Sequence, residues 1–128
     1  MDINELLEHA KEARKYAYAP YSKYKVGAAV LACGKVFKGC NIENASYGLT
    51  VCAERVAIFN AVSHGCRDIE AIAIYAEKMP YPCGACLQVM SEFCDESCMV
   101  LISDGKRVEK YELRELLPKK FEALKAND

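Results

Sequence analysis

The chain has 128 residues and a formal net charge of −1, from 17 Lys and Arg against 18 Asp and Glu. Its length predicts a single domain over residues 1–128 with a core of its own, and its balanced charge gives no electrostatic reason to bind nucleic acid. No apolar run reaches the roughly 18 residues of a membrane span, and the polar start M-D-I-N-E is unlike a signal peptide, so we expect a cytoplasmic protein that binds neither membranes nor nucleic acid.

Helices and strands alternate along the predicted chain. A capping-box-like start at Asp2, followed by apolar residues at helical spacing, predicts a first helix that ends at Pro20. Periodicity and turn residues predict the remaining elements, which in chain order are strands over 26–31 and 36–40, a loop over 41–48, a helix over 52–63, a strand over 69–75, a helix from about 84, strands over 98–103 and 107–111, and a short helix over 112–117. This order mixes hairpins with helical crossovers. We therefore expect the α/β class, in a three-layer α-β-α arrangement with a single mixed β-sheet flanked by helices.

Eight cysteines are the unusual feature of the composition, which includes no Trp and two His. Because nothing in the sequence directs export, we expect these cysteines to be reduced rather than paired in disulfides. Three of them fall in motifs described below. The other five lie in apolar or turn segments and are expected to be free thiols that act as small buried hydrophobic residues: Cys33, Cys40, Cys66, Cys94 and Cys98.

Two motifs place cysteines where predicted helices begin, C-A-E-R at 52–55 and P-C-G-A-C at 82–86. A helix N-terminus carries partial positive charge and free N–H groups, which favour the metal-binding thiolate. Cys83 and Cys86 have a common zinc-chelate spacing, and Cys52 would add a third ligand. Since no fourth protein ligand is evident, one tetrahedral position of Zn²⁺ stays open for water, which is typical of a catalytic site.

Two charged residues beside Cys52 extend this hypothesis. Glu54 is placed to hydrogen-bond the metal's water and take its proton, the arrangement found in zinc deaminases. Arg55 is placed to donate hydrogen bonds to the thiolate sulfurs and so to support them from outside the ligand set. The C-x-x-C motif alone is also compatible with a thioredoxin-like redox pair or with a structural zinc site. The presence of Cys52 and Glu54 at matching spacing disfavours the redox pair. The lack of an evident fourth ligand disfavours the structural zinc site.

With these residues in place, the chain resembles the cytidine deaminases, in particular their small homotetrameric class. The resemblance runs from the first helix to Phe121 and rests on the segments A-Y-A-P-Y-S-K-Y-K-V-G-A-A (17–29), G-C-N-I-E-N-A-S-Y (39–47), C-A-E-R, P-C-G-A-C and E-L-L-P (115–118). It implies a cytidine deaminase-like fold, one Zn²⁺ per subunit on Cys52, Cys83 and Cys86, and Glu54 as proton shuttle. The implied reaction is hydrolytic deamination of cytidine and 2′-deoxycytidine to uridine and 2′-deoxyuridine with release of ammonia, in pyrimidine salvage.

The resemblance also implies roles for five residues toward a nucleoside substrate. Asn41 and Glu43 hydrogen-bond the sugar, the Ala53 backbone N–H meets the pyrimidine carbonyl, and Tyr24 packs beside the ligand. Phe121 reaches the base from a neighbouring subunit, so that active sites of the homotetramer are shared. The chain departs from the family at two positions: Tyr24 stands where Phe is frequent, and Leu87 stands where many members have a basic residue.

Three alternative functions remain to be weighed. Blasticidin S deaminases share the zinc motifs and the size, and the N-I-E-N segment favours plain nucleosides over that substrate. Deaminases of tRNA or single-stranded DNA must hold a polyanion, which the near-neutral charge disfavours. A third alternative, from another class, is a non-catalytic zinc-stabilised or redox binding module.

Overall fold

The computed structural model describes residues 2–123 of the chain. Its elements are α1 (Ile3–Arg14), β1 (Val26–Ala32), β2 (Lys35–Cys40), the 3₁₀ helix η1 (Tyr47–Leu49), α2 (Ala53–Ser63), β3 (Ile69–Ala76), α3 (Gly84–Phe93), β4 (Met99–Ser103), β5 (Val108–Glu112) and α4 (Leu113–Leu116). All strands and all α-helices but the first lie within about two residues of their predicted bounds, and η1 falls at the end of the segment predicted as a loop over 41–48.

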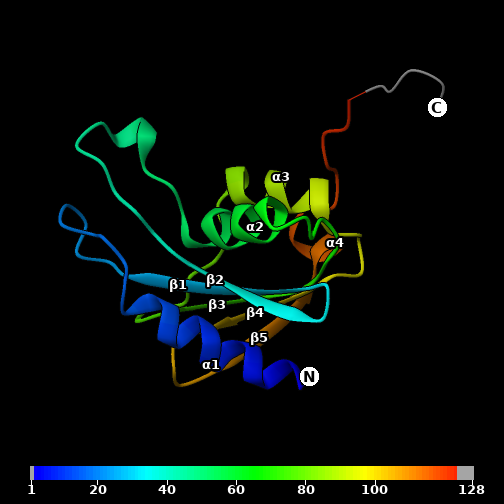
Figure 1. The fold of residues 1–128 in the computed structure, drawn as a ribbon, viewed down its shortest axis with the longest axis horizontal. Coiled ribbons are helices and arrows are strands. Elements are labelled where there is room, and N and C mark those ends of the chain that lie inside the picture. The colour runs from blue at the N-terminus through cyan, green and yellow to red at the C-terminus, as the bar shows by residue number, and fades with distance from the viewer. Residues whose placement is uncertain (1, 124–128) are drawn as a thin grey trace.

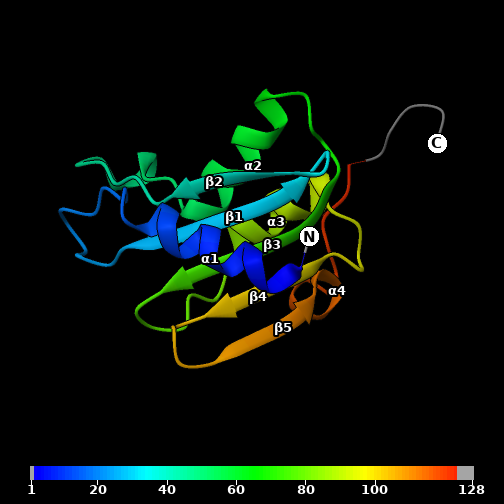
Figure 2. The same cartoon turned by 60° about the horizontal axis from the view of Figure 1, so that its bottom comes forward.

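The strands form one five-stranded sheet in the order β2-β1-β3-β4-β5. Neighbouring strands are antiparallel except β3 and β4, which are parallel and are connected through α3. Helix α1 covers one face of the sheet, and α2 and α3 lie side by side on the other (Figures 1 and 2). The predicted three-layer α-β-α arrangement with a single mixed sheet is therefore confirmed.

Small residues on the sheet let both helical layers approach closely. Under α1 the core contains Ala29, Ala71 and Ala73, together with Leu6 from the helix. An ideal Cβ at Gly27 would lie 1.9 Å from the carbonyl oxygen of an α1 residue, so this position in β1 requires glycine. Larger aliphatic side chains fill the space between the opposite face and helices α2 and α3: Ile58, Ile72, Ile74, Met90, Val100 and Ile102.

The first helix ends earlier than predicted, at Arg14 rather than Pro20. Beyond it, Tyr18 leaves the helical hydrogen-bond pattern and forms an isolated parallel bridge with Ile42. Its N–H donates to the Asn41 carbonyl (3.0 Å), and its own carbonyl accepts from the Glu43 N–H (2.9 Å). Pairing with a distant loop thus replaces the last helical turns that local periodicity predicted. The segment 18–26 is consequently anchored beside the 41–43 loop.

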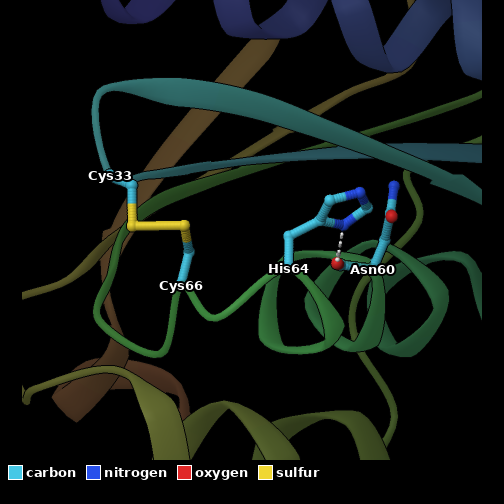
Figure 3. The surroundings of a disulfide bond; sticks show 4 residues. All are labelled: Cys33, Asn60, His64 and Cys66. Carbon is cyan, nitrogen blue, oxygen red and sulfur yellow. Dashed lines mark hydrogen bonds between the residues drawn. A yellow bond between two sulfur atoms is a disulfide. The ribbon is translucent and has the colours of Figure 1, made fainter.

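The prediction that all five remaining cysteines are free thiols is wrong for two of them. Cys33 and Cys66 form a disulfide, with their Cα atoms 5.7 Å apart (Figure 3). The bridge joins the β1–β2 turn to the segment after α2, and it brings together residues 33 positions apart in the chain. Pairing of Ala32 with Ile69 in the β1–β3 register brings these two segments together. Cys40, Cys94 and Cys98 are free, as expected; Cys94 and Cys98 are buried, and Cys40 is half-buried.

Within residues 2–123, every helix falls short of the length and apolarity that crossing a membrane would require.

Candidate metal centre and active site

The three motif cysteines converge between the N-terminal ends of α2 and α3. Cys52 is the N-cap of α2, Cys83 is the N-cap of α3, and Cys86 lies in the first turn of α3. The Cys83 sulfur lies 3.9 Å from that of Cys52 and 3.4 Å from that of Cys86. All three sulfurs lie within 4.8 Å of one another, and among the described residues this group contains no fourth Cys, His or carboxylate ligand.

This arrangement fits a zinc ion. Zn–S bonds of about 2.3 Å at tetrahedral angles place sulfur atoms about 3.8 Å apart, close to the separations observed here. Three sulfur donors leave one tetrahedral position free of protein, as in catalytic zinc sites. The Cys86 backbone N–H also points at the Cys83 sulfur, 3.4 Å away, as expected where a helix N-terminus supports a thiolate.

Electrostatics favour ionisation at Cys52. Its hydrogen bond with Cys86 lowers the pKa of Cys52 to about 5, against the opposing effect of burial, and Arg55 lowers it further. The same hydrogen bond, with burial, raises the pKa of Cys86. The Arg55 guanidinium Nη2 donates to the Cys52 sulfur at 3.6 Å. Arg55 thus stands where it can offset the negative charge of sulfur ligands without binding the metal itself.

Glu54 is the buried acid of the site. It lies in the first turn of α2 and is only 5% exposed. Burial raises its pKa to about 7, and the charge of Cys52 adds to this effect. A carboxyl group with a pKa near neutrality can both accept and return a proton under physiological conditions, which is what a general acid–base residue requires.

A pocket of about 240 Å³ opens beside these residues. It is lined by Ser22, Tyr24, Val26, Asn41, Glu43, Thr50, Cys52, Ala53, Glu54, Pro80, Tyr81 and Cys83. Every site residue that the sequence indicated lies in this wall except Arg55, Cys86 and Phe121. Phe121 is 75% exposed, and its carbonyl accepts a hydrogen bond from the Gln88 side chain on α3 at 3.1 Å.

The Glu43 and Asn41 side chains also form hydrogen bonds within the protein, to residues of the 21–26 segment. One Glu43 oxygen accepts from the N–H groups of Tyr21 (3.0 Å) and Ser22 (3.1 Å), and the other accepts from the Ser22 hydroxyl. The Ser22 hydroxyl and these N–H groups lower the pKa of Glu43, so it is ionised at neutral pH. Asn41 is buried, with its amide oxygen accepting from the Val26 N–H at 2.9 Å. Both side chains therefore hold the 21–26 segment against the pocket, and both keep unused hydrogen-bonding capacity for a ligand.

The two departures from the family pattern have visible consequences. The Tyr24 hydroxyl donates to the Lys78 carbonyl at 2.6 Å, a bond that phenylalanine could not form. Leu87 is partly buried and packs against the core cluster beneath α2 and α3. Five other residues of the pocket wall were not predicted as site residues from the sequence: Ser22, Val26, Thr50, Pro80 and Tyr81. Ser22 lies inside the quoted A-Y-A-P-Y-S segment, which was a usable signal; no comparable local signal exists for Tyr81.

Comparisons with known proteins agree with this geometry. Residues 1–102 match the family described as the cytidine and deoxycytidylate deaminase zinc-binding region. A cytidine deaminase from Halalkalibacterium halodurans is 49% identical over the whole of both chains. The crystal structure of a cytidine deaminase from Burkholderia pseudomallei superposes with a TM-score of 0.90 at 47% identity, covering 94% of this chain and all of that one.

A blasticidin-S deaminase from Bacillus cereus is more distant, at 34% identity over 91% of this chain and 90% of its own. The family description names zinc, and the three-sulfur group on α2 and α3 fits that ion as the cofactor. The match over residues 1–102 and the full-length relatives show that the chain belongs to the zinc-dependent cytidine and deoxycytidylate deaminase family.

Proposed function

We propose that this protein is a cytidine deaminase, which converts cytidine and 2′-deoxycytidine with water into the uridine forms and ammonia. The observation that carries the proposal is the position of Glu54. Its buried carboxyl lines the same pocket as two of the three sulfur ligands and as the ionised Glu43. A proton-transfer group, a metal site and a hydrogen-bond acceptor for hydroxyl groups are thus within reach of one small ligand.

Cys52, Cys83 and Cys86 would hold Zn²⁺, which would supply the Lewis acidity that makes water a competent nucleophile near neutral pH. Glu54 accepts the proton of the attacking water and delivers it to the ring nitrogen beside the carbon under attack. It then assists the second proton transfer, which releases the exocyclic amine as ammonia. One water is consumed and one ammonia leaves, so a single carboxyl group can serve every step and return to its starting state.

The remaining pocket residues orient the nucleoside. The first N–H groups of a helix have no intrahelical partner, so the Ala53 N–H at the start of α2 is available to the pyrimidine carbonyl. Glu43 is ionised and accepts hydrogen bonds from sugar hydroxyls, with Asn41 beside it. The ring of Tyr24 forms the wall next to the base.

Blasticidin S is the alternative substrate, and the relative that carries that name supports testing it. Glu43 and Asn41 favour a sugar bearing free hydroxyl groups. Initial rates with cytidine, 2′-deoxycytidine and blasticidin S, followed by ultraviolet absorbance and ammonia release, distinguish the two. A non-catalytic zinc or redox module would show no turnover of any of the three, with or without added Zn²⁺.

We also propose that the protein acts in pyrimidine salvage in the cytoplasm, as a homotetramer with shared active sites. Phe121 lies outside the pocket wall of its own chain and is exposed, which supports a wall completed by a neighbouring subunit. Phe121 is the exposed aromatic residue that we assign to a neighbour's pocket. Native mass spectrometry, which reports subunit number and metal per subunit, tests this assembly.

The decisive test of the reaction is Glu54→Gln. This variant should keep its zinc and fold while losing at least roughly 100-fold in kcat, since it cannot carry a proton. Glu8→Gln is the matched control, because Glu8 is an exposed helical carboxylate on α1, across the sheet. A Glu54→Gln protein with near-normal turnover would eliminate the proposed role, and a chelator should abolish the activity of the wild type.

A further inference from the structure

The connection between β3 and α3, residues 77–83, forms one wall of the substrate pocket. Pro80 and Tyr81 line that pocket, and Cys83 at its end supplies a sulfur ligand. The connection contains neither helix nor strand. One local backbone bond, from the Tyr81 N–H to the Met79 carbonyl (3.1 Å), tightens it. Its position must therefore depend largely on contacts with other elements.

One such contact lies on the edge strand β5. Glu109 accepts a hydrogen bond from the Tyr81 hydroxyl at 2.8 Å and another from the Tyr111 hydroxyl at 2.6 Å, both on the same carboxylate oxygen. Its other oxygen lies 3.4 Å from the Arg107 guanidinium. The Glu109 side chain is 25% exposed, and its bond with Tyr111 is partly shielded from water, whereas Tyr81 is 53% exposed and its bond with Glu109 lies at the surface. The Glu109 carboxylate is therefore held by two tyrosine hydroxyls at one oxygen and by the Arg107 guanidinium at the other.

The strand geometry explains why this carboxylate meets the connection. Residues two apart on a strand point to the same face, so Glu109 and Tyr111 share one face of β5, and Arg107 lies just before the strand. Tyr111 packs against the core cluster beneath α2 and α3, which identifies that face as the one bearing the metal site. Glu109 also stands opposite Ile102 of β4 in the register, and Ile102 belongs to the same cluster.

The charges of the Glu109 carboxylate and of the two tyrosine hydroxyls that bind it do not change around neutral pH. Hydrogen bonds from Tyr111 and Tyr81 lower the pKa of Glu109. In return, Glu109 raises the pKa of Tyr111 to about 12 and that of Tyr81 above its usual range. The carboxylate stays an acceptor and the two hydroxyls stay donors throughout the range in which the enzyme would work.

A second tyrosine also holds the connection. The Tyr24 hydroxyl donates to the carbonyl of Lys78, at 2.6 Å, three residues before Tyr81. The pocket-lining Pro80 lies between these two attachment points and is buried. Tyr24 belongs to the pocket wall itself, whereas Glu109 does not.

We propose that Glu109 is a positioning residue for the deamination reaction: by holding the Tyr81 hydroxyl it sets the pocket wall formed by residues 80 and 81. The inference rests on the proposed function. Glu54 and Cys52 belong to the start of α2, and Cys83 at the end of the connection is held as the N-cap of α3. Losing the Glu109 contact should therefore disturb substrate binding at residues 80 and 81 more than the chemical step. KM should therefore rise while kcat changes little.

The experiment compares Glu109→Ala, Glu109→Gln and Tyr81→Phe with the wild type, all loaded with zinc. Glu109→Ala and Tyr81→Phe should each raise KM for cytidine roughly tenfold, the effect of one hydrogen bond to a charged group, with kcat within about threefold. Combining them should add little, because both remove the same bond. Glu109→Gln, which keeps an acceptor oxygen, should restore part of the loss. The control is Glu70→Gln, an exposed carboxylate on β3 to which no hydrogen bond or ion pair is assigned within residues 2–123.

Amide hydrogen exchange of the 77–83 segment gives a readout that needs no substrate. Exchange there should be faster in Glu109→Ala and Tyr81→Phe than in the wild type and the control, with one zinc still bound per chain. Unchanged exchange, or a KM within twofold of the wild type in both variants, would overturn the proposal, as would a loss of kcat that simply follows loss of zinc. Should Glu109→Ala fail to fold, Tyr81→Phe alone decides, since it removes one hydroxyl. A wild type that leaves cytidine unchanged would refute the proposed function, and the exchange data would still judge the Glu109 contact.

Discussion

Replacing Gly39 by alanine tests how strictly the sheet positions the metal-binding end of α2. Gly39 lies in β2 directly beneath that helix. An ideal Cβ at this position would lie 2.3 Å from the Ala57 nitrogen and 2.8 Å from the Ala53 carbonyl oxygen. Real Cβ contacts essentially never fall below 3.0 Å, so the backbone of α2 or β2 has to move. Both colliding atoms are backbone, so no side chain can rotate away to relieve the contact.

The expected magnitude follows from that displacement. Forcing one extra carbon into a well-packed interior costs about 1–3 kcal/mol of unfolding free energy. The shift also moves Cys52 and Glu54, which begin the same helix. Because a misplacement of about 1 Å can cost roughly 100-fold in rate, kcat/KM should fall about 10- to 100-fold even in the folded protein.

Chemical unfolding, zinc content and kcat/KM for cytidine are measured on the same preparation. Gly48→Ala serves as the matched control, since a Cβ at Gly48 meets nothing within 4 Å and its backbone does not adopt a positive φ. The reasoning would be refuted by a Gly39→Ala protein whose stability and kcat/KM both equal those of the control.

Three further predictions concern separate parts of the molecule. Arg55→Ala should keep the fold but weaken zinc binding about 10- to 100-fold, because the Cys52 sulfur loses its guanidinium donor; unchanged zinc retention against a competing chelator, together with unchanged turnover, would count against it. Cys33→Ser should lower the unfolding free energy by about 4 kcal/mol in urea, since it opens a cross-link spanning 33 residues; finding all eight thiols free in denatured, unreduced wild type would contradict the pairing with Cys66. Phe121→Ala should leave stability nearly unchanged, because the side chain is exposed, and should reduce kcat/KM roughly tenfold if it stacks on a neighbour's substrate; full activity in the assembled variant would refute that role.

Local interactions explain why so much could be predicted. Helix α2 begins directly after the cysteine of C-A-E-R and α3 directly after the first cysteine of P-C-G-A-C, because the signals that start a helix act within a few residues. The alternation of strands and helices was readable for the same reason. The family motifs carried the metal ligands and Glu54, since each motif is short and contiguous.

Contacts between segments far apart in the chain could not be predicted from local sequence patterns. The first helix ends at Arg14 because Tyr18 pairs with the 41–43 loop, which local periodicity cannot reveal. Cys33 and Cys66 looked like isolated thiols until the β1–β3 register brought their segments together. The contact between Tyr81 and Glu109 likewise exists only because β5 lies beside the connection that precedes α3.

The sequence by itself determined where helices begin, in what order strands and helices follow one another, and which cysteines can bind a metal. Those properties depend on residues a few positions away along the chain. Tertiary structure alone decided that Cys33 pairs with Cys66, that Glu54 is buried, and which tyrosines hold the pocket wall. The physical reason is that burial and side-chain contact depend on how the sheet orders its strands, a property of the whole chain that no short stretch of it contains.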